Sequence, residues 1–237
     1  RWSSLMGKQM HSYFQAYQRA AETVEARTDD AEFPPLHAAT PANDGWTFSF
    51  GRLDDAENYL LDYGMVVHND GTVDQFSHFE ERYEASASHT LHARALAAVI
   101  DTFRTRIRTD PSFEAPNYRV AVLPFPQGQL TAFVSPSQTD GTVMQMGNDV
   151  MYRLNHNDAT IVDVLRFHHR LIRVPLDAST DLSEEAGMPA LLVPDAPFPS
   201  PVDVLHAMER NTSIVVLTKH GVVTIRENGD IEAVPDD

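Results

Sequence analysis

The sequence predicts an α+β fold, in which an antiparallel β-meander is flanked by helices and preceded by an N-terminal helical and acidic region. Residues 2–27 and 91–108 repeat apolar side chains every three or four positions, which is typical of amphipathic helices. Residues 117–174 contain short apolar runs separated by Gly, Asn and Pro, which indicates successive antiparallel strands. A capped helix at 200–210 would join the helix at 91–108 in covering the sheet.

The N-terminal part is expected to be a helix followed by a linker. Residues 28–45 carry Pro34, Pro35 and Pro41 and several acids with little periodicity, which favours a linker or a long surface loop. We therefore expect two parts. Residues 1–45 form the N-terminal helix and an acidic, proline-containing linker, and residues 46–237 form one α+β domain.

The first elements of that domain are expected to be a strand, a helix and a hairpin. The strand covers residues 46–50, and the helix covers 53–63 with acids in its first turn, where they complement the helix dipole. Residues 65–68 and 72–76 flank the sequence Asn-Asp-Gly, which supplies the positive φ angles of a tight hairpin turn.

The remaining elements form the meander and a closing unit. The expected strands of the meander are 118–123, 130–134, 142–146, 150–154 and 159–171. In the closing unit an apolar run at 188–193 leads through a proline-rich loop to the helix at 200–210 and a hairpin of strands 212–218 and 222–226.

Composition excludes several classes of protein. The chain has no cysteine, which excludes disulfides, thiolate nucleophiles and cysteine-ligated zinc. No apolar run approaches the roughly 20 residues that span a bilayer. The chain begins at Arg1 rather than Met, so either its start is trimmed or a leader is removed. We expect a periplasmic protein, or one anchored to a membrane by a removed N-terminal segment, with a cytoplasmic location as the alternative.

The net charge of −16 is concentrated in one stretch. Residues 28–84 hold thirteen acidic residues and only Arg52 and Arg82 as bases. Such a surface repels phosphate backbones and anionic lipids, so nucleic acid is not an expected partner. The charge favours a basic protein partner or serves solubility alone. The candidate partner-binding residues are Asp54, Asp55, Glu57, Asp62, Asp70 and Asp74.

Ser200-Pro201-Val202-Asp203 is a strong start signal for the last helix. The Ser side chain can accept from the N3 amide, the Asp at N3 can reach back, and Pro at N1 loses no hydrogen bond. The same stretch, with its preceding strand and following hairpin, resembles the JAMM (JAB/MPN-like) metallopeptidase fold, in which a Ser-x-x-Asp opens a helix. The resemblance covers about forty residues.

The resemblance implies a zinc site made from two His and an Asp, with an upstream Glu as general base and a Ser at the oxyanion. Where the family has His-x-His-Pro, residues 193–197 here read Val-Pro-Asp-Ala-Pro and supply no histidine. Asp195 and Asp203 alone would be a poor zinc site, because catalytic zinc needs three converging ligands. We therefore expect no metal or other cofactor.

Two neighbouring histidines are the remaining candidates for chemistry. His168 and His169 lie in the strand expected at 159–171, so their side chains should point to opposite faces. If one of them faced Asp195, the pair could perform acid–base chemistry.

These features favour a non-catalytic bacterial envelope protein that binds a protein partner, for example an immunity or inhibitor protein against a basic toxin enzyme. The alternative is a divergent JAMM-like metal-dependent peptidase or other hydrolase, with His168, His169, Asp195, Ser200 and Asp203 as its site.

Overall fold

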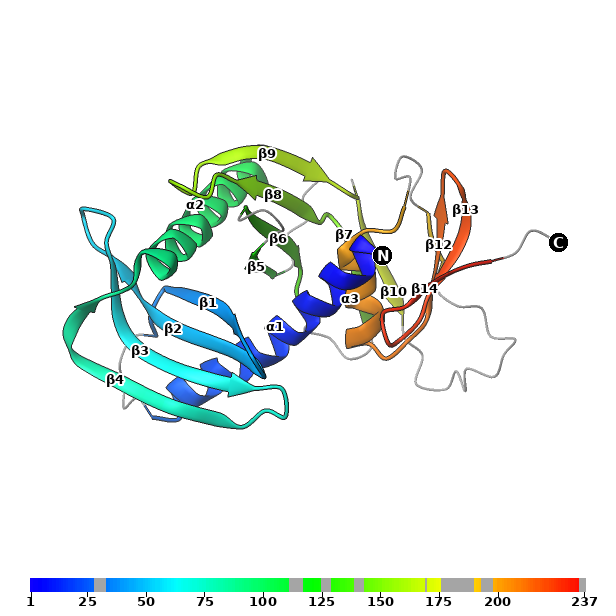
Figure 1. The fold of residues 1–237 in the computed structure, drawn as a ribbon. Coiled ribbons are helices and arrows are strands. Elements are labelled where there is room, and N and C mark those ends of the chain that lie inside the picture. Colours follow the sequence, from blue (N-terminus) through cyan, green and yellow to red (C-terminus); the bar gives the residue numbers. More distant parts are fainter. Residues whose placement is uncertain are drawn as a thin grey trace.

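The computed structural model describes residues 1–27, 33–110, 117–124, 129–138, 143–168, 170–175, 190–192 and 198–234. These residues form an α+β fold of helices and mainly antiparallel sheets (Figure 1). Among them, no helix combines the length and the apolarity needed to cross a membrane.

The first sheet is a four-stranded antiparallel meander. Its strands are β1 (Leu36–Ala42), β2 (Gly45–Leu53), β3 (Tyr59–His68) and β4 (Val73–Glu84), in that spatial order. Helix α1 (Trp2–Glu25) packs on one face and buries Met10, Tyr13 and Phe14 against β2 and β3. The helix expected at 2–27 and the hairpin turn between β3 and β4 are confirmed.

Two expectations for this region are wrong. The expected helix at 53–63 is a turn followed by β3, in which every second side chain from Tyr59 to Val67 is buried, the period of a strand. Part of the expected linker at 28–45 is β1, which pairs with β2 along its length. Pro41 is tolerated in β1 because this strand lies at the sheet edge.

The second sheet confirms the antiparallel strands expected after residue 117. It consists of β5 (Tyr118–Pro124), β6 (Leu130–Pro136), β8 (Val150–Leu154) and β9 (Ile161–Arg166). Helix α2 (Ala87–Thr109) covers one face with Leu96, Val99 and Phe103 in a shared core. The helix expected at 91–108 is therefore confirmed.

The strand expected at 159–171 is interrupted. Strand β9 pairs with β8, whereas β10 (Leu171–Pro175) pairs with β7 (Val143–Gly147) in a separate two-stranded sheet. The chain changes sheets between Arg166 and Leu171, so His168 lies at a corner rather than in a strand.

The closing unit is confirmed within the described residues. Strand β11 (Ala190–Leu192) lies parallel to β12 (Ile214–Thr218), and helix α3 (Pro201–Glu209) precedes β12. Strands β13 (Gly221–Ile225) and β14 (Ile231–Ala233) complete the sheet. Helix α3 packs closely on α1, because Gly7 has no side chain: a Cβ there would lie 2.4 Å from Cβ of Val204.

Candidate functional site

The N-terminus of α3 carries the first part of the candidate site. The backbone N–H of Asp203 donates to Ser200 Oγ at 3.1 Å, and the backbone N–H of Ser200 donates to Asp203 Oδ2 at 2.8 Å. The predicted capping box is therefore confirmed. Both side chains are buried, with exposed fractions of 1% and 0%.

The corner between β9 and β10 brings His168 against this helix start. His168 Nδ1 bonds to Asp149 Oδ1, and His168 Nε2 lies 3.4 Å from Asp203 Oδ1. Ser200 Oγ also donates to Asp149 Oδ2 at 3.4 Å. One imidazole therefore lies between two carboxylates in the protein core. We call Asp149, His168, Ser200 and Asp203 the buried cluster.

A tight turn between β7 and β8 positions Asp149. Gly147 and Asn148 both have positive φ, 86° and 52°, and a Cβ on Gly147 would lie 2.0 Å from the carbonyl oxygen of Arg170. Arg166 fixes the two sides of the corner by donating from Nη2 to Asn148 Oδ1 at 2.8 Å and from Nε to the carbonyl of His168 at 3.0 Å.

Burial and charge act against each other in the buried cluster. Burial lowers the pKa of His168, but Asp149 and Asp203 outweigh it and raise the pKa to about 9. Burial raises the pKa of Asp203 to about 6, against the opposing effect of His168. Near pH 7 the imidazole is therefore protonated and acts as the cation that two carboxylates share.

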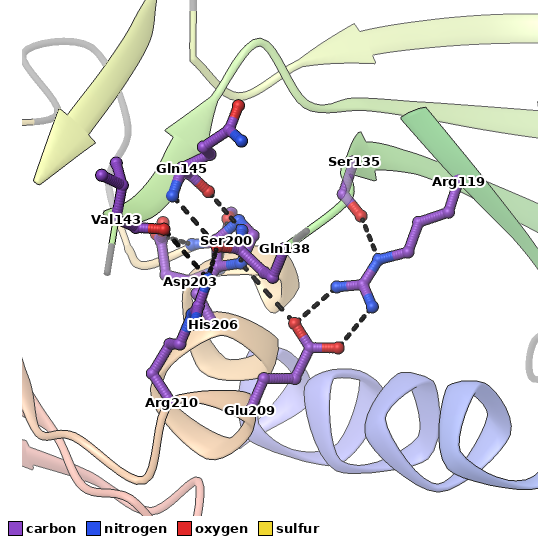
Figure 2. A network of polar contacts seen from close by, with 10 residues as sticks. All are labelled: Arg119, Ser135, Gln138, Val143, Gln145, Ser200, Asp203, His206, Glu209 and Arg210. Atoms are coloured by element: carbon purple, nitrogen blue, oxygen red, sulfur yellow. Dashed lines mark hydrogen bonds and ion pairs between the residues drawn. The ribbon is translucent and has the colours of Figure 1, made fainter. Parts of the chain in front are cut away.

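A second polar network continues from α3 toward β5 and β7 (Figure 2). Gln138 Nε2 donates to His206 Nδ1 at 3.1 Å, and Arg210 donates to Gln138 Oε1 at 3.0 Å. The two carboxylate oxygens of Glu209 accept hydrogen bonds from the two terminal nitrogens, Nη1 and Nη2, of Arg119. Burial and neighbouring cations, Arg119 first, lower the pKa of His206 well below its usual value, so this imidazole is neutral.

The buried cluster has no open access among the described residues. Its four side chains are at most 6% exposed. None of them lines the recesses of about 400, 600 and 700 Å³ on the described part of the protein. Within those residues, no group of three or more His, Asp and Glu is arranged to hold a metal ion. The contacts instead join the β7–β8 turn and the β9–β10 corner to the start of α3, as a structural ion-pair network does.

The structure brings only some of the predicted catalytic candidates together. His168, Ser200 and Asp203 meet, whereas His169 and Asp195 lie outside the described residues. Asp149 was missed as a partner, because Gly147-Asn148-Asp149 signals only a turn. No local pattern shows that this turn lies against a helix fifty residues later in the chain.

The six candidate partner-binding acids form no single patch. Asp54, Asp55 and Glu57 lie in the turn before β3, and Asp70 lies in the turn after it. The ten residues of β3 separate these turns by roughly 33 Å. Several of these acids also have local contacts.

The local contacts of these acids differ from one to the next. Asp54 Oδ1 accepts from the backbone N–H of Ala56 and Asn58, so it stabilises a turn and not the first turn of a helix. Asp62 pairs with Arg52 at 3.1 Å. Asp74 lies 3.1 Å from His68 Nε2.

Comparison with known proteins yields no match, since no protein-family model, no curated protein and no solved structure matches the chain. The JAMM resemblance therefore stays a proposal, and the capping box gives its Ser200 and Asp203 motif a structural role.

Proposed function

We propose that the chain is a non-catalytic protein that binds a protein partner through an acidic, aromatic bulge on strand β4. The observation that carries this proposal is the register between β3 and β4. Tyr63 lies opposite His78, and Leu61 lies opposite Tyr83, so residues 79–82 of β4 face only Asp62 on β3. Bulges of this kind occur at sheet edges and re-aim side chains. We call residues 79–83 the β4 bulge.

The bulge presents the residue types that protein interfaces use. It brings Phe79 and Tyr83 into a stacked pair, with ring centroids 5.7 Å apart and an interplanar angle of 20°. Tyr83 is 62% exposed. Glu80, Glu81 and Arg82 stand between the two rings in the sequence, and the two acids are exposed. Exposed aromatic anchors with charged neighbours are typical of binding surfaces, and the acids would steer a basic partner.

The proposal has a concrete form in a bacterial envelope. There the chain would act as an immunity or inhibitor protein whose acidic bulge covers the basic substrate-binding surface of a toxin enzyme. The buried cluster supports a role without catalysis, because its four side chains lie away from the surface and contact one another.

The test begins with a photo-crosslinking amino acid at Tyr83, with Leu217, 43% exposed on β12, as the control position. The partner captured in the source cells is then purified and its association rate measured. We expect E80Q/E81Q to slow association roughly threefold to tenfold at low salt, and less at high salt, because salt screens exposed charges.

The matched control is the double variant E25Q/D101N, which removes two exposed acids on α1 and α2. Its net charge therefore equals that of E80Q/E81Q. This variant should associate like the wild type. Equal slowing by both double variants, or crosslinks at Leu217 as strong as those at Tyr83, would contradict the proposal. The acids of the β4 bulge would then serve solubility alone.

A divergent metal-dependent peptidase or other hydrolase is the second candidate. It is favoured by one observation: His168 Nε2 and Asp203 Oδ1 lie 3.4 Å apart, and neither atom has a hydrogen-bond partner in the described part of the chain. Metal analysis of the purified protein after exposure to zinc separates the two candidates. We expect no stoichiometric zinc. One zinc per chain that D203N loses, while the exposed control D158N keeps it, would overturn the non-catalytic proposal.

A further inference from the structure

A recess of about 700 Å³ lies between α1, α2 and β5, away from the β4 bulge. Figure 1 shows β5 between α2 and α1, and both helices contact this strand. The volume falls within the range of small-molecule sites, which often occur between packed units of a protein. We call this recess the α1–α2 groove.

Aromatic rings line the groove on two sides. On one side Tyr17 of α1 lies against His37 of β1, with ring centroids 4.5 Å apart. On the other side Phe103 of α2 meets Tyr118 of β5 edge to face, with centroids 4.8 Å apart. Flat rings on two walls favour a planar aromatic guest, because aromatic pairs contribute beyond the area that they bury.

The charge inside the groove is opposite to that of the whole protein. The chain has 34 acidic residues, yet no Asp or Glu is among the described residues that line the groove. Two arginines line it. Arg119 is committed to Glu209 and stacks on Phe14, with its guanidinium carbon 4.1 Å from the ring centroid.

Arg104, an exposed residue one turn after Asp101 on α2, is the other cation that lines the groove. It lies on α2 between Ile100 and Ile107, on the side of the helix that lines the groove. Within the described residues its side chain makes no hydrogen bond and no ion pair within 4 Å. Burial lowers the pKa of His37 to about 3, so this imidazole is neutral and does not compete for an anion.

We propose that the α1–α2 groove binds a small planar aromatic carboxylate, with its ring between the aromatic walls and its carboxylate on Arg104. Guanidinium groups bind carboxylates through paired, charge-assisted hydrogen bonds. This site is separate from the proposed partner surface, so either proposal can fail without the other.

The probe is 2-naphthoate, titrated into the full chain and followed by calorimetry and by NMR of the backbone amides. We expect saturable binding of one naphthoate per chain. R104Q should weaken naphthoate roughly tenfold, as expected for loss of a hydrogen bond to a charged group. Neutral 2-naphthalenemethanol should bind wild type and R104Q within about twofold of each other, because it does not need the cation.

R108Q is the matched control, since Arg108 lies one turn further along α2, is exposed and does not line the groove. It should bind both probes like the wild type. I100W should fill the groove and abolish binding of both probes, and its thermal unfolding curve reports whether it is folded. If I100W unfolds, Y17L serves as the second groove variant and should weaken both probes. Binding that does not saturate, or equal naphthoate affinities for R104Q and R108Q, would overturn the proposal.

Discussion

Replacing His168 with Asn should lower the free energy of unfolding by about 3–5 kcal/mol at pH 7, the usual cost of removing one partner from a buried ion pair. The imidazole is the cation that Asp149 and Asp203 share, and all three side chains are buried. Without it, two carboxylates face each other in the core, and at least one must take up a proton. Denaturant unfolding of both proteins at several pH values measures the loss.

D149N is the informative comparison. It keeps a hydrogen-bond acceptor for His168 and leaves Asp203 as the counter-charge, so we expect a loss of only about 1–2 kcal/mol. The double variant H168N/D149N should be more stable than H168N, because it removes the repulsion between two buried acids. If H168N and D149N are equally destabilised, His168 does not stabilise the fold by neutralising the two buried carboxylates.

The pH dependence of the wild type gives a second readout of the same contact. The folded pKa of His168, about 9, is above the unfolded value of 6.5, so its contribution is fully present below pH 6.5 and is lost as the pH rises through 9. This contribution is about 3 kcal/mol. Stability should therefore fall between pH 6.5 and 9 in the wild type, and this fall should be absent from H168N.

Local patterns were enough to predict α1, α2 and α3 and the β3–β4 turn. Each of these depends on residues close in sequence, such as the Ser200 and Asp203 capping box or the apolar face of α2. The segment 53–63 was misjudged because acids after Leu53 resemble a helix start. The alternating burial of β3 and the turn around Asp54 decide the structure there.

The buried cluster could be predicted only in part. The sequence identified Ser200 and Asp203 through their spacing and His168 as a residue type. Their meeting with Asp149 depends on the chain leaving one sheet for another between Arg166 and Leu171. That change of sheet is a property of strand pairing over long distances, and no local signal in the residues themselves encodes it.

The protein should lose stability in mild acid, because histidines are buried in neutral form. Burial lowers the pKa of His37 and of His92 to about 3. His37 Nε2 bonds with the Tyr13 hydroxyl, and His92 Nε2 is buried without a partner in the described residues. Below pH 6.5 the unfolded chain protonates these imidazoles, whereas the folded chain does so only near pH 3, so folding stability is present above pH 6.5 and declines as the pH falls.

The variant H92L measures how much His92 contributes to the loss of stability in mild acid. The free energy of unfolding of H92L should decrease between pH 8 and pH 5 by about 2 kcal/mol less than that of the wild type, whatever its value at pH 8. This difference corresponds to the roughly 1.5 pH units between the unfolded pKa of histidine and pH 5. Asp203, whose pKa is raised to about 6, acts in the opposite direction but is common to both proteins. Parallel profiles for H92L and the wild type would show that His92 takes up its proton in the folded state, and the acid sensitivity would then have to come from other groups.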